Sequence, residues 1–459
     1  MARVIAQGQP ETPRLPNVSP FRRRVVWPLG LYAVLLFCQL WIDVSGFTVR
    51  AEDVLAFVLL SILLFPILAT GKLRYSQNPL NRPLLVWCTV LLLSVGTTMF
   101  SPYSGLVKKD AAVNGIRLVL AVGTFYVVER HPAPAGRKLQ GVVGTVLGFS
   151  LVTTAVSLLQ MGHWDGWLPI SLPSMLTTFR EGANTQPGRE LFALYLGDTG
   201  SHTWSGSLAM QALLVWVLTS YTRRPGRKLF IWAYFTLLMY ILVRVSVRNS
   251  ILGLFASIAT LVVLRASTKH WFNKMLRIVS LICLTVVLFY GLLYVIPDTY
   301  FVQRIRQVVP RVETGKVIID RGSNVYGRFD YWVAALRMFA GSPIFGRGYY
   351  SYRALSEQFL TRPIVHAHNA YLQTLAETGL IGAAVLGWVS LSLVRYLRRV
   401  RRSCGLRSSA KLLWELTVGS FVFLAFTSMF GNTLWSPNHV AFRMIILGIL
   451  VDTVRDRTR

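Results

Sequence analysis

The stretch from His366 to Gly382 combines residues suited to acid–base chemistry with the start of a long apolar run. The run continues to Val394, and a transmembrane helix needs about 20 mostly apolar residues. Counting back from Val394 places His368 about two turns above the hydrocarbon, facing water. A neutral imidazole there can accept a proton near pH 7. The stretch therefore predicts a catalytic base, His368, at the mouth of a membrane helix.

A histidine at a helix start can instead be a capping or hydrogen-bonding residue with no chemistry, and both interpretations stay open. Asn369 and Glu377 are supporting residues in the same stretch, and both resemble residues of a helix start. A straight helix turns about 900° between His368 and Glu377, which puts the two side chains on opposite faces. We therefore expect Glu377 to bind a neighbouring helix or backbone rather than to orient His368.

A second polar focus is the short stretch Arg244 to Ser250, which separates two apolar runs. Arg248 comes just before Asn249 and Ser250, both good N-cap residues. A helix N-terminus favours anions, and an adjacent guanidinium strengthens that preference. Arg244 lies one turn earlier, and charged residues at such depth usually mark a site. The alternative is that both arginines extend to lipid headgroups.

Arg117 lies one turn inside the predicted outer end of the fourth apolar segment. It could join the arginine cluster or pair with Asp110, and the sequence does not choose between the two. Other site types lack support, because there is no phosphate-binding loop, dinucleotide motif or acidic metal motif. His366 and His368 alone are too few ligands for a metal. We expect no cofactor and no metal.

Composition places the chain among helical membrane proteins. Hydrophobic residues make up 53% of the 459, and only 19 residues are Asp or Glu. A soluble chain of this length would carry far more charge. The net charge of +29 could suggest nucleic acid, but the basic residues sit in short loops between apolar runs. There they orient helices and contact anionic membrane lipids, so we expect no nucleic-acid partner.

The apolar segments predict an all-α polytopic protein of about twelve transmembrane helices. They lie near residues 25–42, 53–70, 83–100, 113–128, 140–160, 206–221, 229–247, 249–264, 276–296, 368–394, 412–430 and 437–454. Basic residues concentrate in the N-terminal tail, the even-numbered loops and the C-terminal tail, which makes both termini cytoplasmic. The predicted organisation is a cytoplasmic tail (1–24), helices 1–9 (25–296, with an outer loop at 161–205), a long extracytoplasmic loop (297–367), helices 10–12 (368–454) and a cytoplasmic tail (455–459).

The long outer loop has an organisation of its own. Between Arg328 and Phe339, apolar residues recur at spacings of three and four, which predicts an amphipathic helix over the membrane face. Gly341 and Pro343 should end that helix. The pair Gly346 and Gly348 should then form a tight turn leading back toward His366.

Three motifs in this order resemble the O-antigen ligase and O-antigen polymerase family. They are the His-Asn pair at His368 with Glu377 and Gly379 following, the segment Val245 to Ser250, and the element from Arg328 to Gly348. The resemblance covers roughly Ser246 to Gly382. Two positions depart from the family pattern: Asn249 stands where a Gly or small residue is usual, and Arg347 lies inside the Gly-x-Gly turn.

The resemblance implies a glycosyltransferase of the bacterial inner membrane. It would move a saccharide from an undecaprenyl-diphosphate carrier to an acceptor hydroxyl on the periplasmic side. The acceptor would be a lipid A core for a ligase, or a second lipid-linked saccharide for a polymerase. The family roles make His368 the general base or acceptor-positioning group and Arg248 and Arg328 the binders of the diphosphate. Guanidiniums can neutralise such a leaving group without a metal.

The alternative class is a membrane transporter of a saccharide lipid or a small anion. Nearly every Asp and Glu falls outside the apolar runs, which leaves little for proton or sodium coupling. A non-catalytic scaffold is a third possibility, but it leaves the His368 and Arg248 motifs unexplained.

Overall fold

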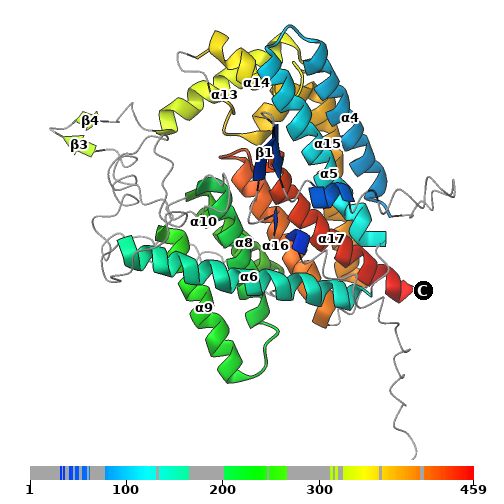
Figure 1. Ribbon diagram of the computed structural model, residues 1–459, viewed down its shortest axis with the longest axis vertical. Helices are drawn as coiled ribbons and strands as arrows, with labels where there is room; N and C mark the ends of the chain where they lie inside the picture. Colours follow the sequence, from blue (N-terminus) through cyan, green and yellow to red (C-terminus); the bar gives the residue numbers. More distant parts are fainter. Residues whose placement is uncertain are drawn as a thin grey trace, which may run out of the picture.

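The computed structural model describes the greater part of the chain (Figure 1). The described residues are 31–33, 35–36, 41–44, 47–50, 54–58, 61, 78–130, 134–164, 201–244, 248–265, 311–313, 316–318, 324–360, 364–403 and 408–458.

Apolar helices dominate the described residues. Seven are long and apolar enough to cross a membrane: α4 (Asn81–Phe100), α5 (Gly105–Arg130), α6 (Ala135–Trp164), α9 (Pro225–Arg244), α15 (Ala370–Ser403), α16 (Ser408–Ser428) and α17 (Pro437–Thr458). Two shorter apolar helices are α8 (Ser201–Thr219) and α10 (Arg248–Arg265). These helices coincide with nine of the predicted apolar segments. The predicted segments 25–42, 53–70 and 276–296 lie largely outside the described residues, so the total of twelve stays a prediction.

The described residues are otherwise helical, which agrees with the predicted all-α class, and two short hairpins are the exceptions. β1 (Trp41–Val44) pairs antiparallel with β2 (Phe47–Arg50), Trp41 opposite Arg50. β3 (Arg311–Glu313) pairs with β4 (Lys316–Ile318) in the same way. The β1–β2 hairpin overlaps the end of the predicted first helix. Its β-branched residues, such as Ile42 and Val49, favour strand conformation where the apolar run ends.

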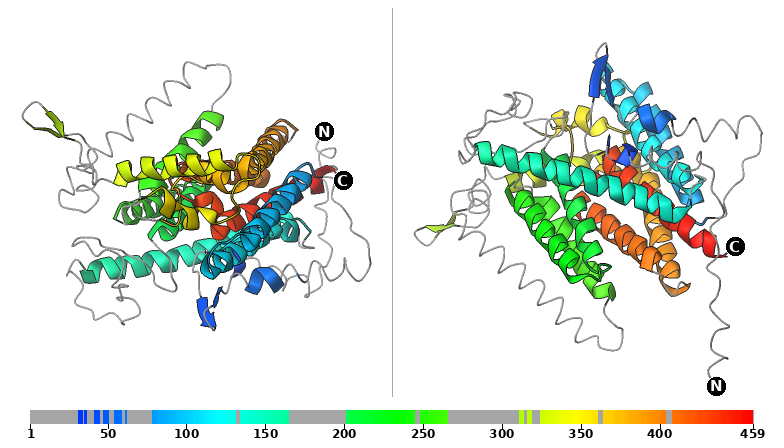
Figure 2. Two further views of the ribbon diagram at one scale, coloured as in Figure 1. Left: turned by 90° about the horizontal axis from the view of Figure 1, so that it is seen from above. Right: turned by 60° about the horizontal axis from the view of Figure 1, so that its bottom comes forward.

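The long helices pack into one bundle with two chemically different ends. α17 packs along α5, α16 packs against α10 and α17, and α6 crosses α8, α9 and α17 (Figures 1 and 2). At one end the α5 residue Asp110 pairs with Arg353. At the other end Lys138 bonds Asp452 at 2.7 Å. The basic end of α15 belongs to this second end, where Arg401 donates to the Leu264 carbonyl at 2.6 Å. The loop between α8 and α9 lies there too, since Arg265 at the end of α10 donates to Ser220 at 2.7 Å.

Buried acidic groups in the described helices have partners. Glu415 of α16 forms an ion pair with Arg265 at 2.6 Å. Asp452 of α17 bonds both Lys138 at 2.7 Å and Arg455 at 2.6 Å. An isolated carboxylate in a membrane bundle would be strongly unfavourable, and these pairs avoid that penalty.

The predicted amphipathic helix is α13 (Asn324–Gly341), which lies across one end of the bundle (Figure 2). Its inner face is built from Ala334, Ala335 and Met338, which pack near Tyr352 and Ala376. Phe329 and Leu336 on the other face are 54% and 47% exposed. The helix ends at Gly341 as the sequence predicts, and α14 (Ser351–Leu355) and the 3₁₀ turn η1 (Ser356–Gln358) follow.

Candidate functional site

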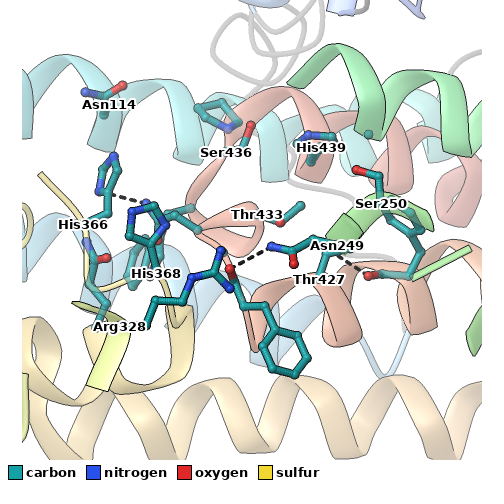
Figure 3. Close-up of a pocket in the computed structure, with 18 of the residues that line it drawn as sticks. Asn114, Asn249, Ser250, Arg328, His366, His368, Thr427, Thr433, Ser436 and His439 are labelled. Atoms are coloured by element: carbon teal, nitrogen blue, oxygen red, sulfur yellow. Dashed lines mark hydrogen bonds between the residues drawn. The ribbon is translucent and has the colours of Figure 1, made fainter. Parts of the chain in front are cut away.

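A cavity of about 340 Å³ opens at the α13 end of the bundle (Figure 3). Residues from seven helices and the loops between them line it: Asn114, Gly206, Asn249, Ser250, Arg328, Tyr349, Tyr350, His366, His368, Gln373, Phe423, Thr427, Phe430, Gly431, Asn432, Thr433, Trp435, Ser436, Pro437 and His439. Arg328, His368 and Asn249, the neighbour of Arg248, come from three different sequence motifs. The fold therefore brings the three motifs to one cavity.

His368 stands just before α15, not inside it. The sequence predicts a helix opening at this residue, but α15 begins at Ala370 and His368 has a φ of 52°. Asn369 caps the helix, since its Oδ1 accepts hydrogen bonds from the Tyr371 and Leu372 amides, both at 3.1 Å. A left-handed backbone at a non-glycine residue costs about 1–3 kcal/mol and is common at functional sites. It turns the imidazole toward the cavity and the ring of Tyr331, 5.9 Å away.

Glu377 acts on the histidine segment through an intermediate residue. The carboxylate is buried, and its Oε1 accepts hydrogen bonds from Gln373 Nε2 at 3.0 Å and the Tyr352 amide at 3.3 Å. Gln373 Oε1 in turn accepts one from the Ala367 amide at 3.3 Å. Ala367 lies between the two histidines. Glu377 therefore holds, through Gln373, the backbone segment that carries His368.

The helix that follows, α15, is broken just beyond Glu377. The helical phase predicted between His368 and Glu377 does not apply for a different reason, because His368 lies before α15. Gly379 has φ 64° and ψ −163°, which interrupts α15. The segment from Pro343 to Gly348 fills the interruption with backbone hydrogen bonds. Leu380 N donates to Pro343 O at 2.8 Å, and Gly348 N donates to Glu377 O at 2.9 Å. Two motifs that are separate in sequence thus form one hydrogen-bonded unit that ties α13 to α15.

His366 is a pocket residue that the sequence argument considers only as a metal ligand. Its Nδ1 lies 3.0 Å from Asn432 Nδ2, and the Tyr350 ring meets its ring edge-on. Burial, with the nearby His368 and Arg353, lowers the pKa of His366 to about 4. His366 is therefore neutral at pH 7. Among the described residues, no group of three His, Cys, Asp or Glu side chains has the arrangement of a metal site.

The predicted arginines occupy different places. Arg328, in the first half of α13, lines the cavity, and burial lowers its pKa. Arg244 is the last residue of α9 and Arg248 the first of α10. Arg117 is buried within α5 and does not line the cavity, while its candidate partner Asp110 pairs with Arg353.

The start of α10 differs from the prediction. Asn249 and Ser250 lie inside the helix, and their side chains bond neighbouring elements. Asn249 Nδ2 donates to the Phe430 carbonyl at 2.8 Å, and the Ser250 hydroxyl lies 2.9 Å from that of Ser205. These contacts tie α10 to the end of α16 and to α8. A small residue at position 249 could not make the first of them.

Several cavity residues come from elements that sequence reasoning did not connect with the site. They are Asn114 of α5, Gly206 of α8, Thr433 of the 3₁₀ turn η2 (Thr433–Trp435), Ser436 before α17 and His439 in its first turn. Each is an ordinary polar or small residue; Asn114 lies within α5, and the others lie near the starts of their elements. No local spacing distinguishes them, because only the packing of distant helices brings them together.

The fold and the cavity define a multi-pass helical membrane protein with a polar, partly basic pocket at one end of its bundle. Residues 233–387 match the family model described as O-antigen ligase. The match contains Arg248, Arg328 and His368, and it confirms that the chain carries a domain of the O-antigen ligase and polymerase family. This family assignment indicates a membrane glycosyltransferase of the ligase or polymerase type. None of the curated protein sequences matches the chain.

Proposed function

We propose that this protein transfers a saccharide from an undecaprenyl-diphosphate carrier to an acceptor hydroxyl. The observation that carries the proposal is the shared cavity: His368, a candidate base, and Arg328, a candidate anion binder, line it together with the start of α10. Glycosyl transfer from a lipid diphosphate needs both kinds of group.

The chemistry assigns a role to each group. The acceptor oxygen attacks the anomeric carbon, the bond from that carbon to the diphosphate oxygen breaks, and His368 takes the hydroxyl proton. Arg328 and Arg248 bind the diphosphate as negative charge develops on it, and Arg244 adds positive charge at the end of α9. General-base help is typically worth about 10²–10⁴-fold. No metal is needed for charge neutralisation in this scheme.

The remaining predicted residues support this site from a distance. Asn369 caps α15, and Glu377 holds the histidine segment through Gln373. Arg117 is buried in the same helix as the cavity residue Asn114, but it does not line the cavity. Its positive charge would strengthen the binding of an anion only at long range.

The positive-inside rule supports a periplasmic site. The basic residues around Arg401 belong to the end of the bundle opposite the cavity. With that end in the cytoplasm, the cavity and α13 face the periplasm of a bacterial inner membrane, and both chain termini are cytoplasmic. Residues 297–367 would then form the periplasmic loop before α15.

The buried acidic residues of the bundle do not support the transporter alternative, which would need such groups for ion coupling. The buried acids Glu415 and Asp452 are paired with basic residues, and Glu377 is bonded to Gln373 and the Tyr352 backbone. None of these three is placed as an ion-coupling group.

Reconstitution of the purified protein with an undecaprenyl-diphosphate oligosaccharide tests the proposal. The donor is supplied with and without lipid A core. A single capped product indicates ligation, and a ladder of longer lipid-linked chains indicates polymerisation. Transfer should persist in the presence of a chelator. Absence of both products, with the protein folded and oriented, would overturn the proposal.

A further inference from the structure

His439 is a buried histidine that faces the cavity from outside the matched family segment. It lies in the first turn of α17, is 9% exposed and lines the cavity. Its ring nitrogens make no hydrogen bond within the described part of the chain. A buried imidazole without a hydrogen-bond partner is unfavourable unless a ligand or water supplies that hydrogen bond.

The surrounding structure holds this imidazole in place. The ring packs directly on Gly206 of α8, where any side chain would overlap with it. Arg443, one turn further along α17, donates to the His439 carbonyl and, at 2.7 Å, to the Ser420 carbonyl of α16. Arg443 also stacks on Phe423, itself a cavity residue. Gly206 leaves room for the imidazole, and the fully buried Arg443 holds the backbone of His439.

The wall around His439 is polar but uncharged. Asn249, Ser250, Thr433 and Ser436 lie on the same side of the cavity as His439, while Arg328, His366 and His368 lie on the other side (Figure 3). Amides, hydroxyls and an imidazole both donate and accept hydrogen bonds, which suits neutral hydroxyl groups. Trp435 and Phe423 add aromatic surface for an apolar ring face. A phosphate would favour the guanidinium side instead.

We propose that this side of the cavity is the subsite for a saccharide ring of the donor, in which His439 hydrogen-bonds a ring hydroxyl. The inference rests on the proposed function and extends it. His439 is a specificity residue that contacts the sugar, while the diphosphate is held on the Arg328 side. The family match ends at residue 387 and does not include it.

The test separates sugar binding from lipid and phosphate binding. Donor kinetics are measured with undecaprenyl-diphosphate oligosaccharide, and undecaprenyl diphosphate without sugar serves as a competitive inhibitor. In His439→Ala, the donor KM should rise about tenfold, the equivalent of one lost hydrogen bond. The Ki of the sugar-free inhibitor should stay within about twofold of the wild-type value, since the inhibitor lacks the group that His439 binds.

Two further variants keep the test decisive if His439→Ala does not fold. His439→Gln keeps a donor and an acceptor and should restore most of the affinity. Gly206→Ala leaves His439 in the chain but displaces its ring, and should raise the donor KM as His439→Ala does. Thr453→Ala, on the same helix at the opposite end of the bundle, is the control and should leave both constants unchanged.

The outcomes distinguish the two proposals. An unchanged donor KM in both His439→Ala and Gly206→Ala, with an active wild type, overturns the subsite and leaves the transferase proposal standing. A Ki that rises by the same factor as KM assigns His439 to the diphosphate or lipid and also overturns it. If the wild type makes no product from this donor, both proposals fall.

Discussion

Gly346 lies directly against the carbonyl group of Glu377. A Cβ atom at position 346 would overlap with that carbonyl, and Gly346 has a φ of +72°. The contact allows the segment from Pro343 to Gly348 to dock on the broken turn of α15 around Gly379. Through it, the helix that carries Arg328 and the helix that follows His368 keep a defined relation to each other.

Gly346→Ala should therefore damage both stability and activity. Left-handed strain and the overlap each typically cost about 1–3 kcal/mol, and they act together here. We expect a lower midpoint of thermal unfolding in detergent and at least a tenfold loss of transfer, a factor equivalent to about 1.4 kcal/mol. Gly387→Ala is the matched control on α15, because nothing lies near its added methyl group. If the two variants behave alike, the docked segment has no structural role.

His368→Ala should stop product formation while the protein still folds. The side chain is a partly buried group at the cavity wall, so its loss leaves the helix packing intact. The expected loss in kcat is about 10²–10⁴-fold, as for other general bases. Turnover is measured in proteoliposomes, with size-exclusion profiles to check folding. Activity at the wild-type level would eliminate the base mechanism.

Arg328→Lys should lower kcat even though the charge is kept. One ammonium cannot reproduce bidentate binding of a phosphate, and loss of a charge-stabilising donor typically costs about 10²–10³-fold. Arg337→Lys, on the exposed side of the same helix, is the control and should be neutral. Arg248→Lys is expected to resemble Arg328→Lys. Full activity of either variant would instead favour contact of that arginine with lipid headgroups.

His366 should make the folded state sensitive to acid. The unfolded chain takes up a proton near the ordinary pKa of 6.5, while burial holds the native pKa at about 4. Between these values the unfolded state binds more protons, so stability falls as the pH is lowered from 6.5 toward 4. In His366→Asn, the drop in unfolding midpoint over this window should be smaller. An identical drop in both proteins would show that other groups cause it.

Single cysteines can determine the sidedness of the bundle. In a chain lacking its four native cysteines, Arg337→Cys on α13 should react with a membrane-impermeant maleimide added to spheroplasts. Arg224→Cys, in the loop between α8 and α9, should react only after the membrane is permeabilised. The reverse pattern would place the cavity in the cytoplasm and contradict transfer in the periplasm.

Some features of this protein follow from local sequence. Membrane helices such as α15 and α16 are predictable because about 20 apolar residues in a row have no other stable environment than a bilayer. α13 is predictable because its apolar residues recur with the helical period. The same period does not relate Glu377 to His368, because α15 begins at Ala370 and His368 lies before it.

The cavity itself depends on tertiary structure. The break at Gly379 exists because the segment around Pro343 supplies the hydrogen bonds that the helix gives up. His439 reaches the site because α17 packs between α5 and α16, with Gly206 of α8 beneath the imidazole. Sequence spacing records contacts within one helix, whereas these contacts join segments far apart in the chain. Only the packed bundle therefore decides which polar groups face the cavity.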